Sequence, residues 1–419
     1  MAGALSLSWP LLLGIFLLML GNGMQGTLLG VRGGIEAFDA TVMGFIMAGY
    51  FAGFLGGAQV TPWLVHRVGH VRVFAALGSL ISAAFVVFPA IVDPVAWTIM
   101  RLIVGFCYSG VYVVAESWLN DAATNETRGR ILSTYVMMQM LGIIAAQGLI
   151  NVADPAGYDL FVIMSVAVSI SFLPMLLTAG PAPAFATSRR MSLAELFRAS
   201  PLGCVGSFLL GAIFACQFGM AAVYGTAIGL STAEISIFIG AIYVGGLALQ
   251  FPIGWMSDRM DRRRLVTIVT LIGAGGCVIG LLFSGSLPAL VVTALLLGGT
   301  TNPTYSLIIA HTNDFLSHEE MASASGGLIV LNGVGAAGTP IVVGLLMQQI
   351  GPAAFLGFIG LVMALIAGYA LYRSTVRPSP SAAETAPVAP VSLVSGTQVT
   401  AEICQEVVGE KVAGDATAA

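Results

Sequence analysis

Two ionisable side chains lie inside one long apolar stretch of the sequence, where a charge needs a chemical reason. Arg101 opens the segment RLIVGFCYSG, and Glu116 follows fifteen positions later within the apolar run 95–118. A charge at the centre of a membrane-spanning helix costs on the order of 2.5–3.5 kcal/mol, so it generally faces water, a partner or a ligand. We therefore expect Arg101 to face a polar cavity, for anion recognition or coupling. The alternative is that its guanidinium reaches the membrane surface or bonds to backbone carbonyls.

Glu116 lies near the end of the same run. Fifteen helical residues rise roughly 22 Å, so Glu116 cannot pair directly with Arg101. We expect instead a salt bridge with Arg67 or Arg130 that gates this end of the protein. The alternative is that Glu116 carries a proton, because it is the only acid placed deep in an apolar run and no histidine lies well inside one.

Amide side chains form a third candidate group, because lipid tolerates them poorly. Away from the run ends, Asn, Gln and charged residues are absent from every third apolar run: 72–92, 158–179, 264–284 and 353–373. The simplest account makes these four runs lipid-facing supports and lets the others surround a polar cavity. The alternative for any single amide is that it only bonds two helices together, which contributes ~0.6–2 kcal/mol. The expected cavity residues, besides Arg101, are Asn22, Gln25, Gln139, Gln217, Asn302 and Asn332.

The elements that position these residues follow from composition and length. Of the 419 residues, 57% are hydrophobic, and the mean hydropathy is +0.95. About 20 apolar residues suffice to cross ~30 Å of hydrocarbon as a helix. The chain is therefore predicted to be an all-α integral membrane protein with twelve transmembrane helices. We expect them at 9–30, 40–62, 72–92, 95–118, 130–151, 158–179, 201–227, 233–256, 264–284, 287–311, 323–348 and 353–373.

Composition and motifs also exclude several classes of protein. A net charge of −4 and a pI near 5.5 argue against nucleic acid as a partner. The only lysine is Lys411, so the chain has no phosphate-binding loop ending in Gly-Lys-Ser/Thr, and GxSxG and HExxH are absent as well. None of the five cysteines forms a CxxC pair. We therefore expect no enzyme, no catalytic residue, no cofactor and no metal site.

Basic residues orient the predicted helices. They cluster in the loops that follow even-numbered runs, whereas the opposite loops hold only Arg32. Because cytoplasmic loops carry the excess of Lys and Arg, both termini are predicted to lie in the cytoplasm. The segment 180–200 is then a cytoplasmic linker, and the Pro/Ala/Ser-rich segment 376–419 a disordered cytoplasmic tail.

An internal duplication divides the chain. PWLVHRVGHVR (62–72) aligns without gaps to GWMSDRMDRRR (254–264) at an offset of 192, and WLND (118–121) matches HTND (311–314) at an offset of 193. The membrane part is therefore predicted to form two pseudo-symmetric six-helix halves, 1–179 and 201–375. Parallel repeats of this kind occur in secondary transporters, with the substrate site between the halves.

These motifs resemble the major facilitator superfamily. GWMSDRMDRRR is similar to the family's loop motif between helices 8 and 9, and RLIVGFCYSG to its helix-4 motif that begins with arginine. The segment ESWLNDAATNETRGR (116–130) resembles the bacterial YcaD-like branch of transporters. The resemblance implies a major facilitator fold in which the loop motif latches neighbouring helices, and proton coupling at the helix-4 arginine, here Arg101. The resemblance assigns the latch to Asp258, Arg259 and Arg263, and together with the first-half residues at the same end the expected cytoplasmic gate residues are Glu116, Arg67, Arg72, Arg130, Asp258, Arg259 and Arg263.

Two departures from the family pattern qualify the resemblance. His66 stands where the family usually has aspartate, so the first-half latch is weakened or pH-sensitive. The run 130–151 lacks the Gly-x-x-x-Gly-Pro sequence typical of drug/proton antiporters, which weighs against drug efflux.

The sequence thus predicts a monomeric, multi-pass secondary active transporter of the cytoplasmic membrane. It would sit in the lipid bilayer and move a small solute by alternating access, driven by protons, with an organic anion or a drug-like compound as the solute. The alternative function is a non-transporting membrane sensor or assembly factor with the same fold.

Overall fold

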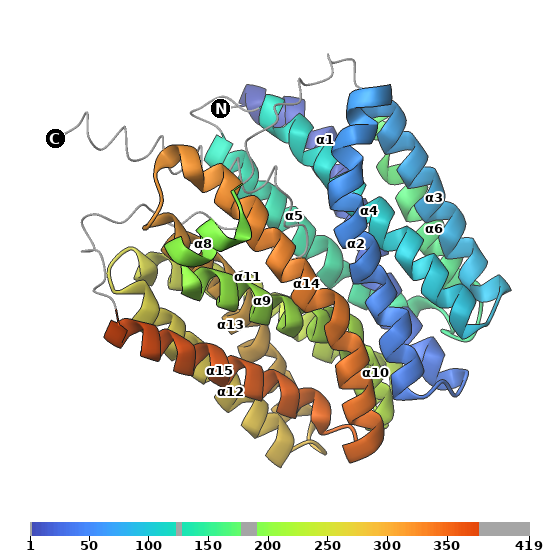
Figure 1. The fold of residues 1–419 in the computed structure, drawn as a ribbon. Coiled ribbons are helices and arrows are strands. Elements are labelled where there is room, and N and C mark those ends of the chain that lie inside the picture. Colours follow the sequence, from blue (N-terminus) through green and yellow to red (C-terminus); the bar gives the residue numbers. More distant parts are fainter. Residues whose placement is uncertain (1, 123–127, 177–190, 377–419) are drawn as a thin grey trace.

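The computed structural model describes residues 2–122, 128–176 and 191–376, except for the side chains of 2–8, 120–122, 128–130, 175–176, 318, 319 and 322. The predicted tail 376–419, apart from its first residue, and most of the predicted linker 180–200 lie outside these residues, as does the side chain of Arg130. Figure 1 shows two groups of helices, one from each half of the chain, packed along a shared interface.

The first half of the chain supplies the group drawn in blue to green-cyan (Figure 1). Its elements are α1 (Ala2–Ile35), α2 (Ala40–Val68), α3 (His70–Ala90), α4 (Pro94–Ala122), α5 (Arg128–Leu149) followed by a 3-10 turn (Ile150–Val152), α6 (Asp159–Ser171) and α7 (Leu173–Leu176).

The second half begins with α8 (Leu193–Ala199) and α9 (Pro201–Ala215). A π turn (Cys216–Met220) joins α9 to α10 (Ala221–Ala227) without a break. The remaining helices are α11 (Thr232–Ser257), α12 (Arg262–Leu282), α13 (Leu287–Asn313), α14 (His318–Ile350) and α15 (Ala354–Val376).

Each of the twelve predicted runs is helical over most of its described length. Ten helices of the described part are long and apolar enough to cross a membrane. The two expected spans outside that set are α6, which has 13 residues before α7 continues it, and α13, which carries the polar sequence Thr300–Thr304.

Two local features differ from the sequence prediction. The predicted linker contains a helix, α8, whose start is fixed by a reciprocal capping box between Ser192 and Glu195. Buried Leu196 of α8 packs beside Gly327 of α14, so this helix is docked on the second half. The predicted run 201–227 is interrupted by the π turn, for which the sequence has no proline or other clear signal.

The four helices predicted to be supports lie at the outside of their own halves. Helices α3 and α6 pack on each other and on their own half, and α12 and α15 do the same in the second half. Their outward faces are apolar, with residues such as Leu80, Val166, Leu271 and Leu361 exposed.

The duplication recurs in the closest helix crossings. A Cβ atom added to Gly53 would lie 1.9 Å from the carbonyl oxygen of Leu102, and one added to Gly105 would lie 1.9 Å from that of Tyr50. In the second half, Gly245 and Gly298 stand at the same offsets, and their added Cβ atoms would lie 2.1 and 1.6 Å from carbonyl oxygens of α13 and α11. The crossings of α2 with α4 and of α11 with α13 therefore use the same glycine contacts.

The bundle has two ends, which we name by their landmarks. The α8 end carries α8, the start of α1 and the end of α2, whereas the distal end carries α10 and the start of α2 (Figure 1). Helices α2 and α14 come together near α10 and diverge toward the α8 end (Figure 1).

The glycine crossings give the first prediction. Gly298→Ala should lower the free energy of unfolding by at least about 3 kcal/mol, because the new Cβ collides with the rigid backbone of α11. Gly275→Ala on α12 is the matched control: nothing lies within 4 Å of its added Cβ, so stability should change by less than about 1 kcal/mol. Thermal unfolding in lipid nanodiscs measures both, and equal stabilities would contradict the close approach of α13 to α11.

Candidate functional site

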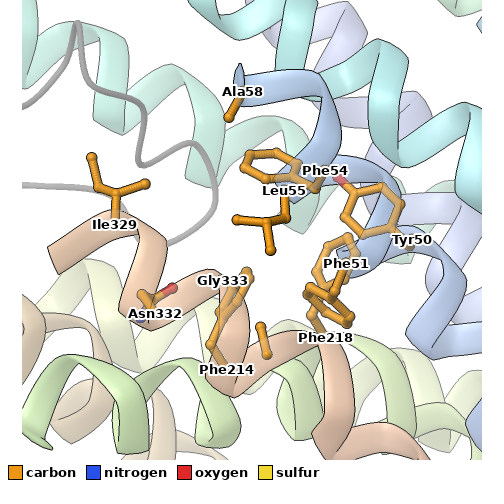
Figure 2. Close-up of a pocket in the computed structure, with 11 residues that line it drawn as sticks. Tyr50, Phe51, Phe54, Leu55, Ala58, Phe214, Phe218, Ile329, Asn332 and Gly333 are labelled. Carbon is orange, nitrogen blue, oxygen red and sulfur yellow. The ribbon is translucent and has the colours of Figure 1, made fainter. Parts of the chain in front are cut away.

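A cavity lies on the interface between the two halves, lined from α2, α9, the π turn and α14 (Figure 2). It comprises about 570 Å³ including its open mouth. Five of its eleven lining residues are aromatic, and no charged side chain of the described residues lines it. The lining residues are Tyr50, Phe51, Phe54, Leu55, Ala58, Phe214, Phe218, Ile329, Asn332, Gly333 and Ala336.

The aromatic rings of the two halves touch one another in this wall. Phe214 and Phe218 of the second half are stacked, with ring centroids 5.7 Å apart and planes at 23°. Phe51 of α2 meets both of them edge-on, at 6.1 Å each. Tyr50 lies 5.4 Å from Phe218. The rings therefore form one continuous surface across the interface.

The π turn presents Phe218 to this wall. A π turn holds one residue more than an α-helical turn and is a common feature of functional sites. On the same turn, Gln217 points elsewhere and donates a hydrogen bond to Thr301 Oγ1 of α13 at 2.9 Å. Phe218 thus lines the cavity, whereas the neighbouring Gln217 bonds to α13 within the second half.

Arg101 lies behind the wall, not in it. Its side chain is fully buried, and its guanidinium carbon lies 4.7 Å from the ring centroid of Tyr50. One Nη donates to Met47 Sδ at 3.3 Å, while Nε and the other Nη have no hydrogen-bond partner among the described residues. The sequence predicted Arg101 in a polar cavity. The structure places it against a cavity-lining tyrosine, outside the lining itself.

A hydrogen-bonded network of amide side chains holds the hydroxyl group of Tyr50. Its hydroxyl donates to Asn22 Oδ1 at 3.2 Å, and Gln25 Nε2 donates to the same oxygen at 2.7 Å. Asn22 Nδ2 in turn donates to the hydroxyl of Tyr112 at 2.8 Å. Three helices, α1, α2 and α4, are therefore linked through Asn22.

The remaining predicted cavity residues are dispersed. Gln139 and Asn302 are buried, and the Asn302 amide packs beside Gly246 of α11. Asn332 lines the cavity and donates to the backbone oxygen of Ser207 at 3.1 Å. Asn332 is thus the one member of the predicted polar set that lines the described cavity, whose wall is mainly aromatic.

A charged cluster ties four helices together at the α8 end. Arg262 forms an ion pair with Asp314, and it also donates to Ala310 O at 3.1 Å and to Ser257 Oγ at 3.2 Å. Arg263 pairs with Asp261 at 3.5 Å and donates to Arg373 O of α15 at 3.2 Å.

The sequence-based latch of Asp258, Arg259 and Arg263 omitted two members of this cluster. Asp258 ends α11, and Arg259 stacks on Trp255 at 4.0 Å and bonds to its carbonyl. The missed residues are Arg262 and Asp314. The duplicated Asn-Asp pair in WLND and HTND was the available signal for Asp314.

The first half repeats part of this arrangement. Arg67 stacks on Trp63 at 5.4 Å, as Arg259 stacks on Trp255, and both tryptophans are exposed. Arg72 is exposed as well. Glu116 is buried and accepts a hydrogen bond of 2.8 Å from the hydroxyl of Tyr135 on α5.

Known proteins resemble this chain in both sequence and structure. The family description "Major Facilitator Superfamily" matches residues 11–221 and again residues 203–403. The chain belongs to the major facilitator superfamily. The second match confirms the predicted duplication at the level of the family.

The relatives within the superfamily agree with the resemblance seen in the sequence. The chain is 23% identical to the protein named "Uncharacterized MFS-type transporter YcaD" of Escherichia fergusonii, over 81% of this chain and 88% of the relative. It is 24% identical to the protein of the same name from Salmonella arizonae over the same shares.

Solved structures show the same fold. A crystal structure of the nucleoside transporter NupG matches with a TM-score of 0.68 at 17% identity, covering 88% of this chain and 98% of that one. A bacterial homologue of the human lysosomal transporter Spinster, inward-facing and unoccupied, matches with a TM-score of 0.66 at 14% identity, covering 97% and 98%. The predicted major facilitator fold is thereby confirmed, and the chain is a multi-pass membrane transporter.

The ion pair of Arg262 and Asp314 predicts how the stability of the protein depends on pH. Burial raises the pKa of Asp314 from 3.8 to about 6, although Arg262 favours the ionised form. Between about pH 4 and 6 the folded protein therefore holds a proton that the unfolded chain has released, so the free energy of unfolding falls as the pH rises through this window.

The side chain in the variant Asp314→Asn does not titrate, so its free energy of unfolding should not fall in this way between about pH 4 and 6. Thermal unfolding of both proteins in nanodiscs at several pH values measures the difference, which should reach on the order of 3 kcal/mol across the window. Parallel pH profiles for the two proteins would show that Asp314 does not titrate there.

Proposed function

We propose that the protein is a secondary active transporter that moves a small solute across the cytoplasmic membrane by alternating access between its two halves. The observation that carries the proposal is the position of the cavity. It lies on the interface of the halves, and the interface is sealed on its distal side.

The distal seal consists of helix contacts between the halves that leave no room for side chains. A Cβ added to Gly44 would lie 2.5 Å from Pro340 O, and one added to Gly344 would lie 2.4 Å from Ala40 O. Between α1 and α10, an added Cβ on Gly30 would lie 2.5 Å from that of Ala222. Such small-residue contacts let helix backbones approach in a membrane.

The cavity residues lie on the α8 side of this seal, where α2 and α14 diverge (Figure 1). This geometry supports access from the α8 end in the present conformation. Transport then requires a second conformation in which the distal seal opens and the α8 end closes.

The basic residues support a cytoplasmic α8 end. Arg67, Arg259, Arg262 and Arg263 lie at this end, and the positive-inside rule favours the cytoplasm for it. Both termini would then be cytoplasmic, in the inner membrane of a bacterium, and we take the transporter to act as a monomer.

The cytoplasmic gate would be built from the paired groups at this end. Arg262 and Asp314 join Arg263 and Asp258 in the second half, and Glu116, Arg67, Arg72 and Arg130 serve the first half. The buried amides and Arg101 would position Tyr50 and the neighbouring helices around the substrate.

Spin-label distances test alternating access without knowledge of the substrate. In a cysteine-free background, one label pair at Thr41 and Gln348 reports the distal end, where these residues are hydrogen-bonded, and one at Gln59 and Ser323 reports the α8 end. Each pair should show two distance populations in nanodiscs. Gly344→Leu should shift the distal pair to the longer distance and the α8-end pair to the shorter one, because the seal cannot close around the added side chain.

Gly338→Leu on the same helix is the matched control, since its added Cβ meets nothing within 4 Å. It should leave both distributions unchanged. A single distance at each end in the wild type, unmoved by Gly344→Leu, would favour the non-transporting sensor or assembly factor instead.

Protons are the driving ion in this proposal, with Glu116 as their carrier. Its carboxylate is buried beside Tyr135 on the α4–α5 contact, so gain of a proton removes a buried charge. Glu116→Gln should abolish the pH dependence of the spin-label populations.

Tyr135→Phe controls for the loss of the hydrogen bond alone, because it keeps the carboxylate and should retain a pH response. A Glu116→Gln protein that responds to pH like the wild type would leave Glu116 in the gate and exclude it as the proton carrier.

A further inference from the structure

We propose that the cavity takes an uncharged, planar aromatic solute that carries a hydrogen-bond donor. The inference rests on the proposed transport function and names the substrate class of the same site. It departs from the organic anion that the sequence suggested through Arg101.

The aromatic lining determines the shape of the solute. Rings from both halves face the same space: Tyr50, Phe51 and Phe54 from α2, and Phe214 and Phe218 from the second half (Figure 2). Aromatic rings prefer offset-stacked or edge-to-face partners with centroids 4.5–7 Å apart, as these rings already show among themselves. A flat ring system can join this arrangement from within the cavity, whereas a sugar-like solute would leave the ring faces without a matching surface.

The charges around the cavity argue against an anion. No charged side chain among the described residues lines the space, and one of the two N–H bonds of the only lining amide is taken by Ser207 O. Arg101 is screened, because Tyr50 and not the guanidinium belongs to the wall. An anion would therefore exchange its hydration for at most one N–H donor of Asn332, which is costly in an apolar site.

The same arginine argues against a cation. Aromatic faces attract cations. However, the guanidinium of Arg101 already lies 4.7 Å from the Tyr50 ring. A cation on the cavity side of this ring would be repelled by Arg101, because a buried site screens like charges less than water does. The repulsion offsets the attraction, so neither sign of charge is favoured.

Asn332 supplies the polar specificity. Its Nδ2 donates to the backbone oxygen of Ser207 at 3.1 Å, which fixes Oδ1 on the other side of the amide. Figure 2 shows this oxygen turned toward the space between α14 and α2. The hydroxyl of Tyr50 is already a donor to Asn22. The cavity therefore offers an acceptor, and a solute N–H or O–H complements it.

Three probes that share one ring system test the charge requirement: indole is neutral, indole-3-acetate anionic and tryptamine cationic at pH 7. Binding is measured by thermal stabilisation of the full-length protein in nanodiscs, and the wild type is compared with Phe218→Leu, because this variant keeps apolar bulk but loses the ring. Partitioning of the probe into lipid affects both proteins alike. Indole should stabilise the wild type, and each charged probe should bind at least tenfold more weakly.

The variant Phe208→Leu is the matched control for the ring. Phe208 lies on α9 like Phe214, but its side chain is exposed on the outer surface. Indole binding should be unchanged in Phe208→Leu and reduced about tenfold in Phe218→Leu.

A fourth probe, 1-methylindole, lacks the N–H donor and tests Asn332. It should bind about fivefold more weakly than indole to the wild type. In Asn332→Leu, which replaces the amide with an apolar group of similar size, the two probes should bind equally.

Three results would overturn the inference: charged probes that bind as well as indole, an unchanged affinity in Phe218→Leu, or a preference for indole over 1-methylindole that survives in Asn332→Leu. Any of them leaves alternating access untouched, because the spin-label distances use no ligand. Conversely, indole binding together with a single fixed conformation would contradict transport. It would still support the inferred class of ligand.

Discussion

The close approach of helix backbones is the constraint on which the rest of this structure depends. In a bilayer, apolar side chains gain little by leaving lipid for a helix interface, so association relies on packing and on polar contacts. Here glycine brings α2 against α4 and α11 against α13 until carbonyl oxygens occupy the space of a side chain. The same device joins the halves at the distal end. Because these contacts are specific in register, they fix which residues face the interface.

Tyr50 shows how one residue connects this packing to the site. Its carbonyl oxygen receives the close contact of Gly105, its ring lines the cavity and covers Arg101, and its hydroxyl holds Asn22. Motion of α2 relative to α4 would therefore disturb packing, cavity and network together. The first-half wall of the cavity is therefore tied to the contact of α2 with α4, and the π turn supplies the irregular element on the other side.

Much of the fold could be predicted from the sequence, and less of the site. Twelve helices in two halves could be predicted from apolar run length, the basic loops and the repeat at offsets 192 and 193. Each of these is a property of the sequence and requires no knowledge of tertiary contacts. The polarity pattern also identified the peripheral helices. It did not show that the cavity is aromatic, since Phe51 and Phe218 look like ordinary core residues until the helix rotation is known. Arg101 could be recognised as exceptional, but only the structure shows Tyr50 between it and the cavity. The capping box of Ser192 and Glu195 was present in the sequence as a sign of α8, whereas the π turn left no such sign.

The two halves repeat the same helix contacts but differ in their charged residues. This difference affects how the protein responds to the membrane potential. At the offset that relates Gly105 to Gly298, Arg101 corresponds to Ala294, and Tyr50 corresponds to Ile242 by the offset of its own helix. The guanidinium of Arg101 thus has no counterpart at the repeated position of the second half. Moving one elementary charge across a full membrane potential of 100 mV is worth about 2.3 kcal/mol. When the halves rotate past each other as proposed, the Arg101 charge travels through part of that field with no equal charge at the repeated position of the other half. The membrane potential would then bias which side the resting protein faces, independently of any solute.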